Sequence, residues 1–83
     1  MRIDRFLFFI RLAKSRTLAQ AIIETGHVRI DSRRVAKPSE EVKVGQVVAL
    51  PIRDQVRVIR VLELPARRGP AAEARSAYEV IEA

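Results

Sequence analysis

The stretch that decides the fold is Arg2-Ile3-Asp4-Arg5-Phe6-Leu7-Phe8-Phe9-Ile10, at the start of the chain. Its core-forming apolar residues follow the spacing i, i+3, i+4 and i+7, which places them on one buried stripe of a helix. These residues are Ile3, Phe6, Leu7 and Ile10. Asp4 stands among Arg2, Arg5 and Arg11 and is predicted to orient them through ion pairs rather than to act as a catalytic acid. The stretch therefore predicts a short helix with one apolar and one basic face.

A second helix is predicted directly after a short connection at residues 11–14. The hydroxyl of Ser15 can accept a backbone N–H two or three residues further on, so Ser15 is the expected N-cap. Leu18, Ala21 and Ile22 supply an apolar stripe, and Gly26 is the expected left-handed terminator. The chain thus opens with two helices joined by a basic turn.

Beyond Gly26 the apolar pattern changes from helical to alternating, which indicates strands and turns. Pro51 lacks an N–H, so its strand is expected at a sheet edge. Val56, Val58, Leu62 and Leu64 share one face of the strand at 56–64, but Arg60 shares that face too, which leaves a bulge or a strong twist near Ile59 open. The predicted elements are strands at 28–30, 34–35, 47–52 and 56–64, turns at 31–32, 44–46 and 53–55, a loop at 65–70 and a short helix from 71 to about 78.

Composition and charge restrict the class of protein. With 83 residues the chain is one domain that buries only about 60 to 65% of its unfolded surface. It contains no Cys and one His, which excludes thiol chemistry and multi-histidine metal sites. The longest apolar run, Phe6 to Ile10, is too short to span a membrane, and no signal peptide is predicted. Paired carboxylates, a nucleophile–base set and a glycine-rich phosphate loop are also missing, so we expect neither an enzyme nor a cofactor.

The formal net charge of +6 lies entirely in the first part of the chain. Residues 1–37 contain nine basic and three acidic side chains, whereas residues 38–83 contain seven of each. Such a basic segment favours a polyanion, above all a nucleic acid. Two basic clusters are candidate phosphate sites: one consists of Lys14, Ser15, Arg16 and Thr17, and the other of Arg29, Arg33, Arg34 and Lys37. Simple helix capping in the first cluster, and protection of a sheet edge in the second, are the structural alternatives.

Several segments match one known family in order and spacing. They are Arg2-Ile3-Asp4-Arg5-Phe6-Leu7, Arg11, Lys14-Ser15-Arg16-Thr17, Ala21, Gly26-His27-Val28-Arg29-Ile30, Lys37-Pro38-Ser39 and Val44-Gly45. Together they resemble the S4 RNA-binding domain over about residues 2–50. Residues 67–71, 73–74 and 78–79 are similar to the segment that follows this domain in small ribosome-associated heat-shock proteins and their short quality-control relatives. Asp31-Ser32 departs from the Asn-Gly that is usual at the family's hairpin turn.

The resemblance implies an α+β, alpha-L (S4-like) fold, with two helices on a small, mostly antiparallel sheet and a short C-terminal helical segment. Residues 1–50 would form the RNA-binding core and residues 51–83 the remaining strands and extension of the same domain. The implied partner is ribosomal RNA of the large subunit, with peptidyl-tRNA on stalled, split subunits as a further one. The protein is expected to be cytoplasmic, and monomeric away from the ribosome.

The residues that would face RNA come from two sources. The resemblance assigns Arg2, Arg5, Arg11, Lys14, Ser15, Arg16 and Thr17, and charge adds Arg29, Arg33, Arg34 and Lys37. Arg67 and Arg68 are expected to form a smaller, secondary RNA contact. No metal-binding residues are predicted.

Three alternative functions stay open from the sequence. A helix-turn-helix DNA-binding protein is compatible with two short helices, although the second helix is poor in base-reading side chains. A general ribosome-assembly or structural RNA binder would use the same basic surface. An accessory domain of an RNA-modifying enzyme such as a pseudouridine synthase is disfavoured, because these 83 residues contain no catalytic region.

Overall fold

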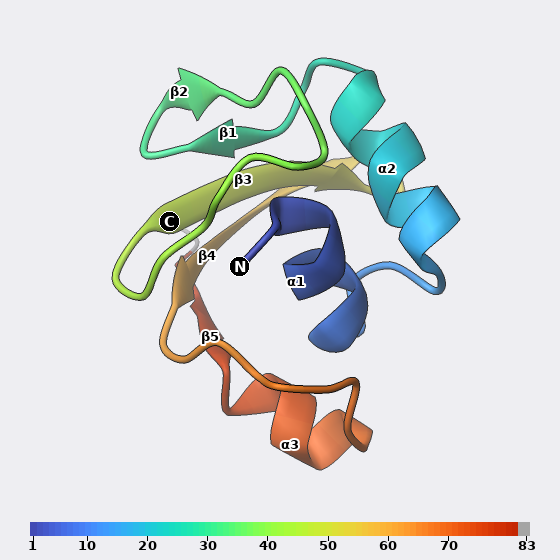
Figure 1. Ribbon diagram of the computed structural model, residues 1–83. Helices are drawn as coiled ribbons and strands as arrows, with labels where there is room; N and C mark the ends of the chain where they lie inside the picture. Colours follow the sequence, from blue (N-terminus) through green and yellow to red (C-terminus); the bar gives the residue numbers. More distant parts are fainter. Residues whose placement is uncertain (82–83) are drawn as a thin grey trace.

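The computed structural model describes residues 1–81, in which two helices pack on one face of a five-stranded antiparallel sheet (Figure 1). The strand order is β2-β1-β3-β4-β5, and every neighbouring pair is antiparallel. The elements are α1 Ile3–Phe9, α2 Arg16–Glu24, β1 Arg29–Ile30, β2 Arg33–Arg34, β3 Val47–Ile52, β4 Gln55–Val61, α3 Ala71–Arg75 and β5 Tyr78–Val80. This architecture confirms the α+β, S4-like prediction.

The core lies between α1, α2 and the sheet. The four apolar residues predicted on the first helix, Ile3, Phe6, Leu7 and Ile10, are all at most 1% exposed. They meet the inward-facing residues of the sheet, which include Ile30, Val48 and Ile59. Because a helix buries one stripe, its other faces remain available, and these carry the basic side chains of α1.

The segment at residues 38–42 covers the N-terminus of α1. The carbonyl oxygens of Glu40 and Pro38 accept the N–H groups of Ile3 at 2.8 Å and Asp4 at 3.2 Å. Val42 N–H donates to the carbonyl of Met1 at 2.8 Å, so this segment is hydrogen-bonded to residues 1–4 at three points. These contacts satisfy N–H groups that a helix leaves without internal partners, so α1 needs no side-chain cap.

Three predicted local features, a helix N-cap, a helix-terminating glycine and a hairpin turn, are present. Ser15 Oγ accepts the N–H of Leu18 at 3.0 Å as the N-cap of α2, and Gly26 has a φ of +84°. Asp31 and Ser32 both have positive φ, of 50° and 70°, which is the pattern of the type I′ hairpin turn. Asp31 fits the first position because its carboxylate also accepts the N–H of Val47 at 2.9 Å. The unusual turn dipeptide therefore still forms a tight hairpin.

Two predictions about the sheet are wrong. β4 buries Ile59 and Val61, not the alternate set of Val56, Leu62 and Leu64, and its pairing with β3 runs without a bulge. Arg60 therefore lies on the exposed face of β4, and the alternation of buried and exposed residues is regular around it. β3 is not an edge strand either. It lies between β1 and β4, and Pro51 is accommodated because β1 pairs only with Val48 and Ala49.

The C-terminal helix is shorter than predicted. α3 ends at Arg75, and Tyr78 belongs to β5, a strand that pairs with β4 through Tyr78↔Val61 and Val80↔Ile59. Strand β5 was not predicted, because three residues carry too little periodicity to reveal a strand. No helix within residues 1–81 is long and apolar enough to cross a membrane.

Candidate nucleic-acid interface

Asp4 is the anchor of the basic surface. Its side chain is fully buried, and it accepts two hydrogen bonds from Arg2, from Nε at 3.1 Å and from a terminal nitrogen at 3.0 Å. Gln20 Nε2 donates to the same carboxylate at 3.0 Å, and the N–H of Arg5 does so at 2.8 Å. Arg16 completes the set with an ion pair at 3.5 Å. One carboxylate thus joins the start of α1 to one side of α2.

The ionisation of Asp4 follows from these contacts. Burial raises the pKa of the Asp4 carboxyl, but hydrogen bonds from Gln20, Arg2 and the Arg5 N–H lower it, and the lowering dominates. The pKa therefore lies below its ordinary value, and the carboxylate is charged at neutral pH. A permanent negative charge at this point can hold two guanidinium groups side by side.

The side chains of Arg2 and Arg16 are 43% and 41% exposed, and both reach the same oxygen, Oδ2 of Asp4. Each guanidinium has five N–H donors, of which Asp4 occupies only part. Two positive charges on one buried negative charge leave a net positive pair that still faces solvent. Such a fixed, planar pair of donors fits the oxygens of a phosphate group.

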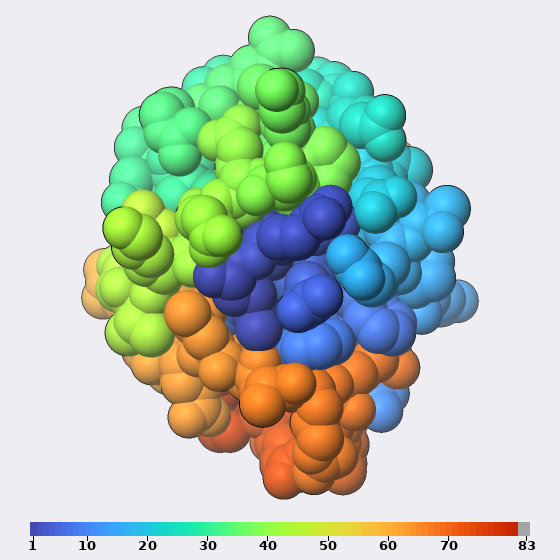
Figure 2. All heavy atoms as spheres, viewed as in Figure 1, coloured from blue at the N-terminus to red at the C-terminus, as the bar shows by residue number. Residues whose placement is uncertain are grey.

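The beginning of α2 lies next to this pair, because Arg16 is its first residue. The N–H groups of Arg16 and Thr17 have no intrahelical acceptor, and the helix dipole places partial positive charge there. Ser15 caps α2, which is the alternative to phosphate binding that the sequence left open for this hydroxyl. Lys14 and Thr17 are exposed. Figure 2 shows α1 and the start of α2 together on one open face of the molecule.

Several cations on this surface have no competing partner. Within residues 1–81, no hydrogen bond or ion pair engages the charged groups of Arg5, Lys14 or Lys37. Lys37 precedes Pro38, whose carbonyl accepts the N–H of Asp4, so it lies close to the start of α1. The structure thus places the backbone at residues 37–38 beside the start of α1, although it comes from a different part of the sequence.

The hairpin cations are distributed differently. Arg33 donates to Glu40 at 2.6 Å, and this ion pair, with the backbone N–H groups of Ala36 and Lys37, lowers the pKa of the Glu40 carboxyl. Arg29 pairs with Arg34 across the β1–β2 ladder and projects from the sheet face opposite the buried Ile30. Arg29 therefore lies on the face of the sheet that α1 and α2 do not cover.

Arg34 lies over the end of α2. A Cβ added to Gly26 would stand 2.9 Å from its guanidinium, and the φ of +84° favours glycine at this position. The hairpin therefore contributes cations at the edge of the sheet and on its far face, rather than one patch beside the helices.

Three further arginines predicted as RNA contacts make contacts within the protein. Arg11 Nε donates to the carbonyl of Gly69 at 2.7 Å, and Arg68 Nε donates to the carbonyl of Phe8 at 3.0 Å. Arg67 pairs with Glu73 at 3.2 Å, with both side chains exposed. Their contribution to RNA binding stays a prediction.

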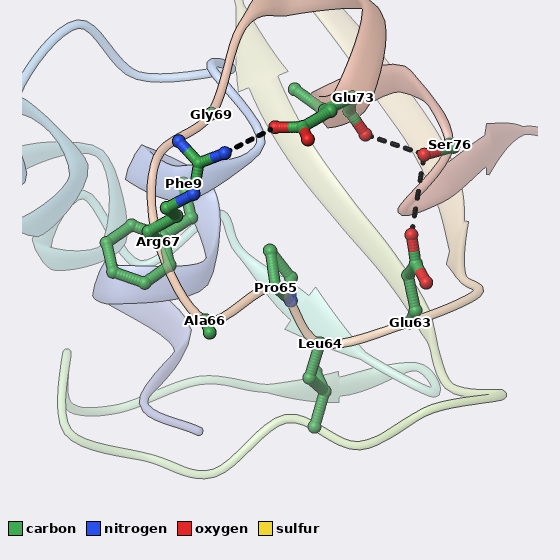
Figure 3. A pocket seen from close by; sticks show the side chains of 10 residues that line it. Phe9, Glu63, Leu64, Pro65, Ala66, Arg67, Gly69, Glu73 and Ser76 are labelled. Atoms are coloured by element: carbon green, nitrogen blue, oxygen red, sulfur yellow. Dashed lines mark hydrogen bonds and ion pairs between the residues drawn. The ribbon is translucent and has the colours of Figure 1, made fainter.

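Next to these arginines, a hollow of about 480 Å³ opens between residues 63–69 and α3 (Figure 3). Phe9 and Leu64 line it, together with the charged side chains of Glu63, Arg67 and Glu73. Two of these three charges are negative, which disfavours a phosphate there. Among residues 1–81, no group of three or more His, Asp or Glu side chains could hold a metal ion.

Gln20 is the functional residue that the sequence analysis missed. It stands four residues after Arg16, so the two side chains project from the same side of α2 and reach Asp4 together. The i, i+4 spacing of Arg16 and Gln20 was the available signal. The predicted orienting role of Asp4 is confirmed for Arg2. Arg5 contributes only its backbone N–H and Arg11 donates to Gly69 instead, whereas Arg16 is the second ionic partner.

Comparison with known proteins identifies the class of this fold. The model of the S4 domain family matches residues 1–48, more than half of the chain, and the chain belongs to this family of RNA-binding domains. A small ribosomal subunit protein uS4 from Lacticaseibacillus casei is 44% identical over 54 residues, which cover 65% of this chain but 27% of that protein. The chain thus spans about a quarter of the length of such relatives.

Over nearly its whole length, the chain is similar to heat shock protein 15. The homologue from Haemophilus influenzae is 34% identical over 82 residues, covering 99% of this chain and 62% of the relative. The trimeric structure of Vibrio cholerae heat shock protein 15 superimposes with a TM-score of 0.90 at 30% identity, over 98% of this chain and 81% of that one. The similarity therefore includes α3 and β5, beyond the S4 domain itself.

Proposed function

We propose that the chain binds structured ribosomal RNA without catalysing a reaction, and that the surface around Asp4 contacts the RNA backbone. The observation that carries the proposal is the anchoring of Arg2 and Arg16 on one buried carboxylate. Two guanidiniums held in place lose little conformational freedom on binding, so more of the phosphate interaction appears as affinity.

The comparisons support the choice of RNA. The S4 family match covers the part of the chain that carries the anchored pair, and the uS4 relatives are by name proteins of the small ribosomal subunit. We propose ribosomal RNA of the large subunit as the partner here, because the full-length similarity is to heat shock protein 15, and the resemblance to small heat-shock proteins of this kind implies that subunit. Stabilisation of peptidyl-tRNA on stalled, split subunits is the specific role proposed.

The proposed contact surface consists of the anchored pair and the cations and hydroxyls that surround it, with the hairpin as its extension. Its members are Arg2, Arg5, Lys14, Ser15, Arg16, Thr17, Arg29, Arg33, Arg34 and Lys37. Arg29 lies on the opposite sheet face, so its phosphate would belong to a different RNA segment from that of Arg2.

The surface is tested by measuring the affinity for a large-subunit rRNA fragment over a series of salt concentrations. Arg2→Ala and Arg16→Ala should each weaken binding and reduce the slope of log K against log salt by about one, because each removes one phosphate contact. Arg75→Ala, on exposed α3, is the matched loss of one positive charge away from the surface. Equal effects of all three variants would contradict the surface.

The partner is tested by sedimentation. Tagged protein should comigrate with free large subunits that carry peptidyl-tRNA, and Arg16→Ala should reduce this fraction. Comigration only with small subunits would refute the large-subunit proposal, and a preference for duplex DNA over rRNA in competition would refute the RNA proposal. The same gradient, run without ribosomes, tests the expected monomer.

A further inference from the structure

Two arginines connect the end of α1 to the loop before α3 in a crossed arrangement. Arg11, just after α1, donates to the carbonyl of Gly69, and Arg68, in the loop, donates to the carbonyl of Phe8 in α1. The partners are 58 and 60 residues apart in the chain. Each segment thus supplies one guanidinium and one carbonyl to a contact that we call the arginine clamp, formed by Arg11, Gly69, Arg68 and Phe8.

The clamp is packed as well as hydrogen-bonded. The guanidinium carbon of Arg68 lies 4.7 Å from the centroid of the Phe8 ring, which is a cation–π distance. The Phe8 carbonyl belongs to the last turn of α1, where carbonyl oxygens lack helical N–H donors and a positive charge is favourable. Gly69 itself is buried. Two hydrogen bonds and a stacked guanidinium therefore hold the loop to the end of α1.

The clamp acts on an unfavourable backbone conformation. Arg11 has a φ of 66°, in the left-handed region that residues with a Cβ avoid. Its N–H donates to the same Phe8 carbonyl that Arg68 contacts, at 3.1 Å. This conformation turns the chain from α1 into the connection that carries Lys14 and into the Ser15 cap of α2. Contacts that stabilise this backbone conformation of Arg11 therefore also set the position of the basic turn.

We infer that Arg11 and Arg68 are positioning residues, through which the segment at residues 62–80 holds the basic turn at residues 11–17 in its RNA-binding arrangement. The inference rests on the proposed function and assigns these two arginines a different role from Arg2 and Arg16. Nε of both residues is already occupied by a backbone carbonyl, and the Arg68 guanidinium is stacked on a ring. Arg68 is also half-buried, so we assign its effect on RNA to the turn rather than to a direct contact.

The experiment compares Arg68→Ala with Arg75→Ala. The two variants lose the same charge, but Arg75 lies at an exposed position of α3, outside both the clamp and the proposed contact surface. Affinity for the rRNA fragment is measured at several salt concentrations, at a temperature where circular dichroism shows every variant folded. Arg68→Ala should weaken binding by about threefold to tenfold with an unchanged salt slope. Arg75→Ala should stay within about twofold of the wild type.

Arg68→Lys separates position from charge. Lysine keeps the charge but cannot offer the planar guanidinium that both stacks on Phe8 and donates to its carbonyl. The variant should therefore bind RNA about as weakly as Arg68→Ala. Restoration of wild-type affinity by Lys, or a salt slope reduced by about one in Arg68→Ala, would show a direct phosphate contact and overturn the inference. Unchanged affinity in Arg68→Ala would overturn it as well.

Hydrogen exchange in the free protein keeps this test separate from that of the proposed function. Arg68→Ala should speed exchange of the Leu18 amide, which the Ser15 cap protects, relative to core amides of β3. If Arg2→Ala and Arg16→Ala leave RNA binding intact, the proposed surface fails while the clamp still predicts this exchange pattern. Equal exchange at Leu18 in wild type and Arg68→Ala would refute the clamp itself.

Discussion

The replacement Asp4→Asn distinguishes anchored cations from net charge as the origin of RNA binding. Asparagine has nearly the same shape as aspartate, and the change raises the formal net charge of +6 by one unit. If net charge controlled affinity, the variant would bind RNA more tightly. If the anchoring of Arg2 and Arg16 controls it, the variant binds more weakly, so the two explanations predict opposite signs.

The loss of stability can be worked out from the contacts of Asp4. The side chain of Arg2 is 43% exposed, so water replaces most of the hydrogen bonding that Arg2 loses when Asp4 loses its charge. Gln20 Nε2 and the Arg5 N–H are part-buried and lose a charged acceptor, while the single amide oxygen of Asn can retain one of these two bonds. One lost bond to a charged group contributes about 1.5–3 kcal/mol to the free energy of unfolding. The melting temperature should therefore fall by about 6–20 °C in a domain of this size.

The loss of affinity comes from the freed side chains. Each immobilised flexible side chain costs about 0.5–1.5 kcal/mol on binding, and Asp4→Asn releases two. Two such side chains amount to about 1–3 kcal/mol, so we expect the Kd to rise by about fivefold to 150-fold. Fluorescence anisotropy of a labelled rRNA fragment measures this, at a temperature where the variant is folded.

Glu79→Gln is the control for this experiment. It raises the net charge equally, on the half-exposed β5 at the opposite edge of the sheet from the hairpin, and costs one exposed ion pair with Arg60. It should bind RNA as tightly as the wild type or slightly more tightly. If Asp4→Asn also binds as tightly as Glu79→Gln, the anchoring argument is refuted.

Three further predictions concern stability. Phe6→Ala, at a fully buried core position, should lower the free energy of unfolding by about 3–5 kcal/mol in urea denaturation. Ser15→Ala removes the cap of α2 and should cost about 1 kcal/mol in the same assay, and an unchanged midpoint would mean that the cap is dispensable. Because the pKa values of Asp4 and Glu40 are lowered in the folded state, the stability they contribute is present above their ordinary values and is lost as pH falls through the folded ones. Acid unfolding followed by circular dichroism should therefore begin below about pH 4, and Asp4→Asn should flatten that limb of the pH profile.

The features that sequence predicted well are those encoded by neighbouring residues. The stripe from Ile3 to Ile10, the Ser15 cap and the Gly26 terminator all act within one or two helical turns, so their pattern is complete in a short window. The hairpin at Asp31-Ser32 is similarly local. Each of these predictions is confirmed by the backbone geometry.

The features that were wrong or missed depend on distant partners. The face that β4 buries is selected by its register with β3. The alternation of Val56, Leu62 and Leu64 indicated the opposite face, but Leu62 and Leu64 lie beyond the end of the strand at Val61. β5 exists because it pairs with β4, which no three-residue pattern reveals. In the site, Gln20 was overlooked because its partner Asp4 lies 16 residues away.

The amino-acid sequence by itself determined that the cations lie in the first 37 residues, that two helices and a hairpin carry them, and that the family is one of RNA-binding domains. Only the tertiary structure decided which cations are anchored at the surface, as Arg2 and Arg16 are on Asp4, and which are engaged within the protein, as Arg11 and Arg68 are. The physical reason is the short range of the interactions that decide it. A hydrogen bond requires its two atoms to lie within about 3 Å, and separation along the chain does not set that distance.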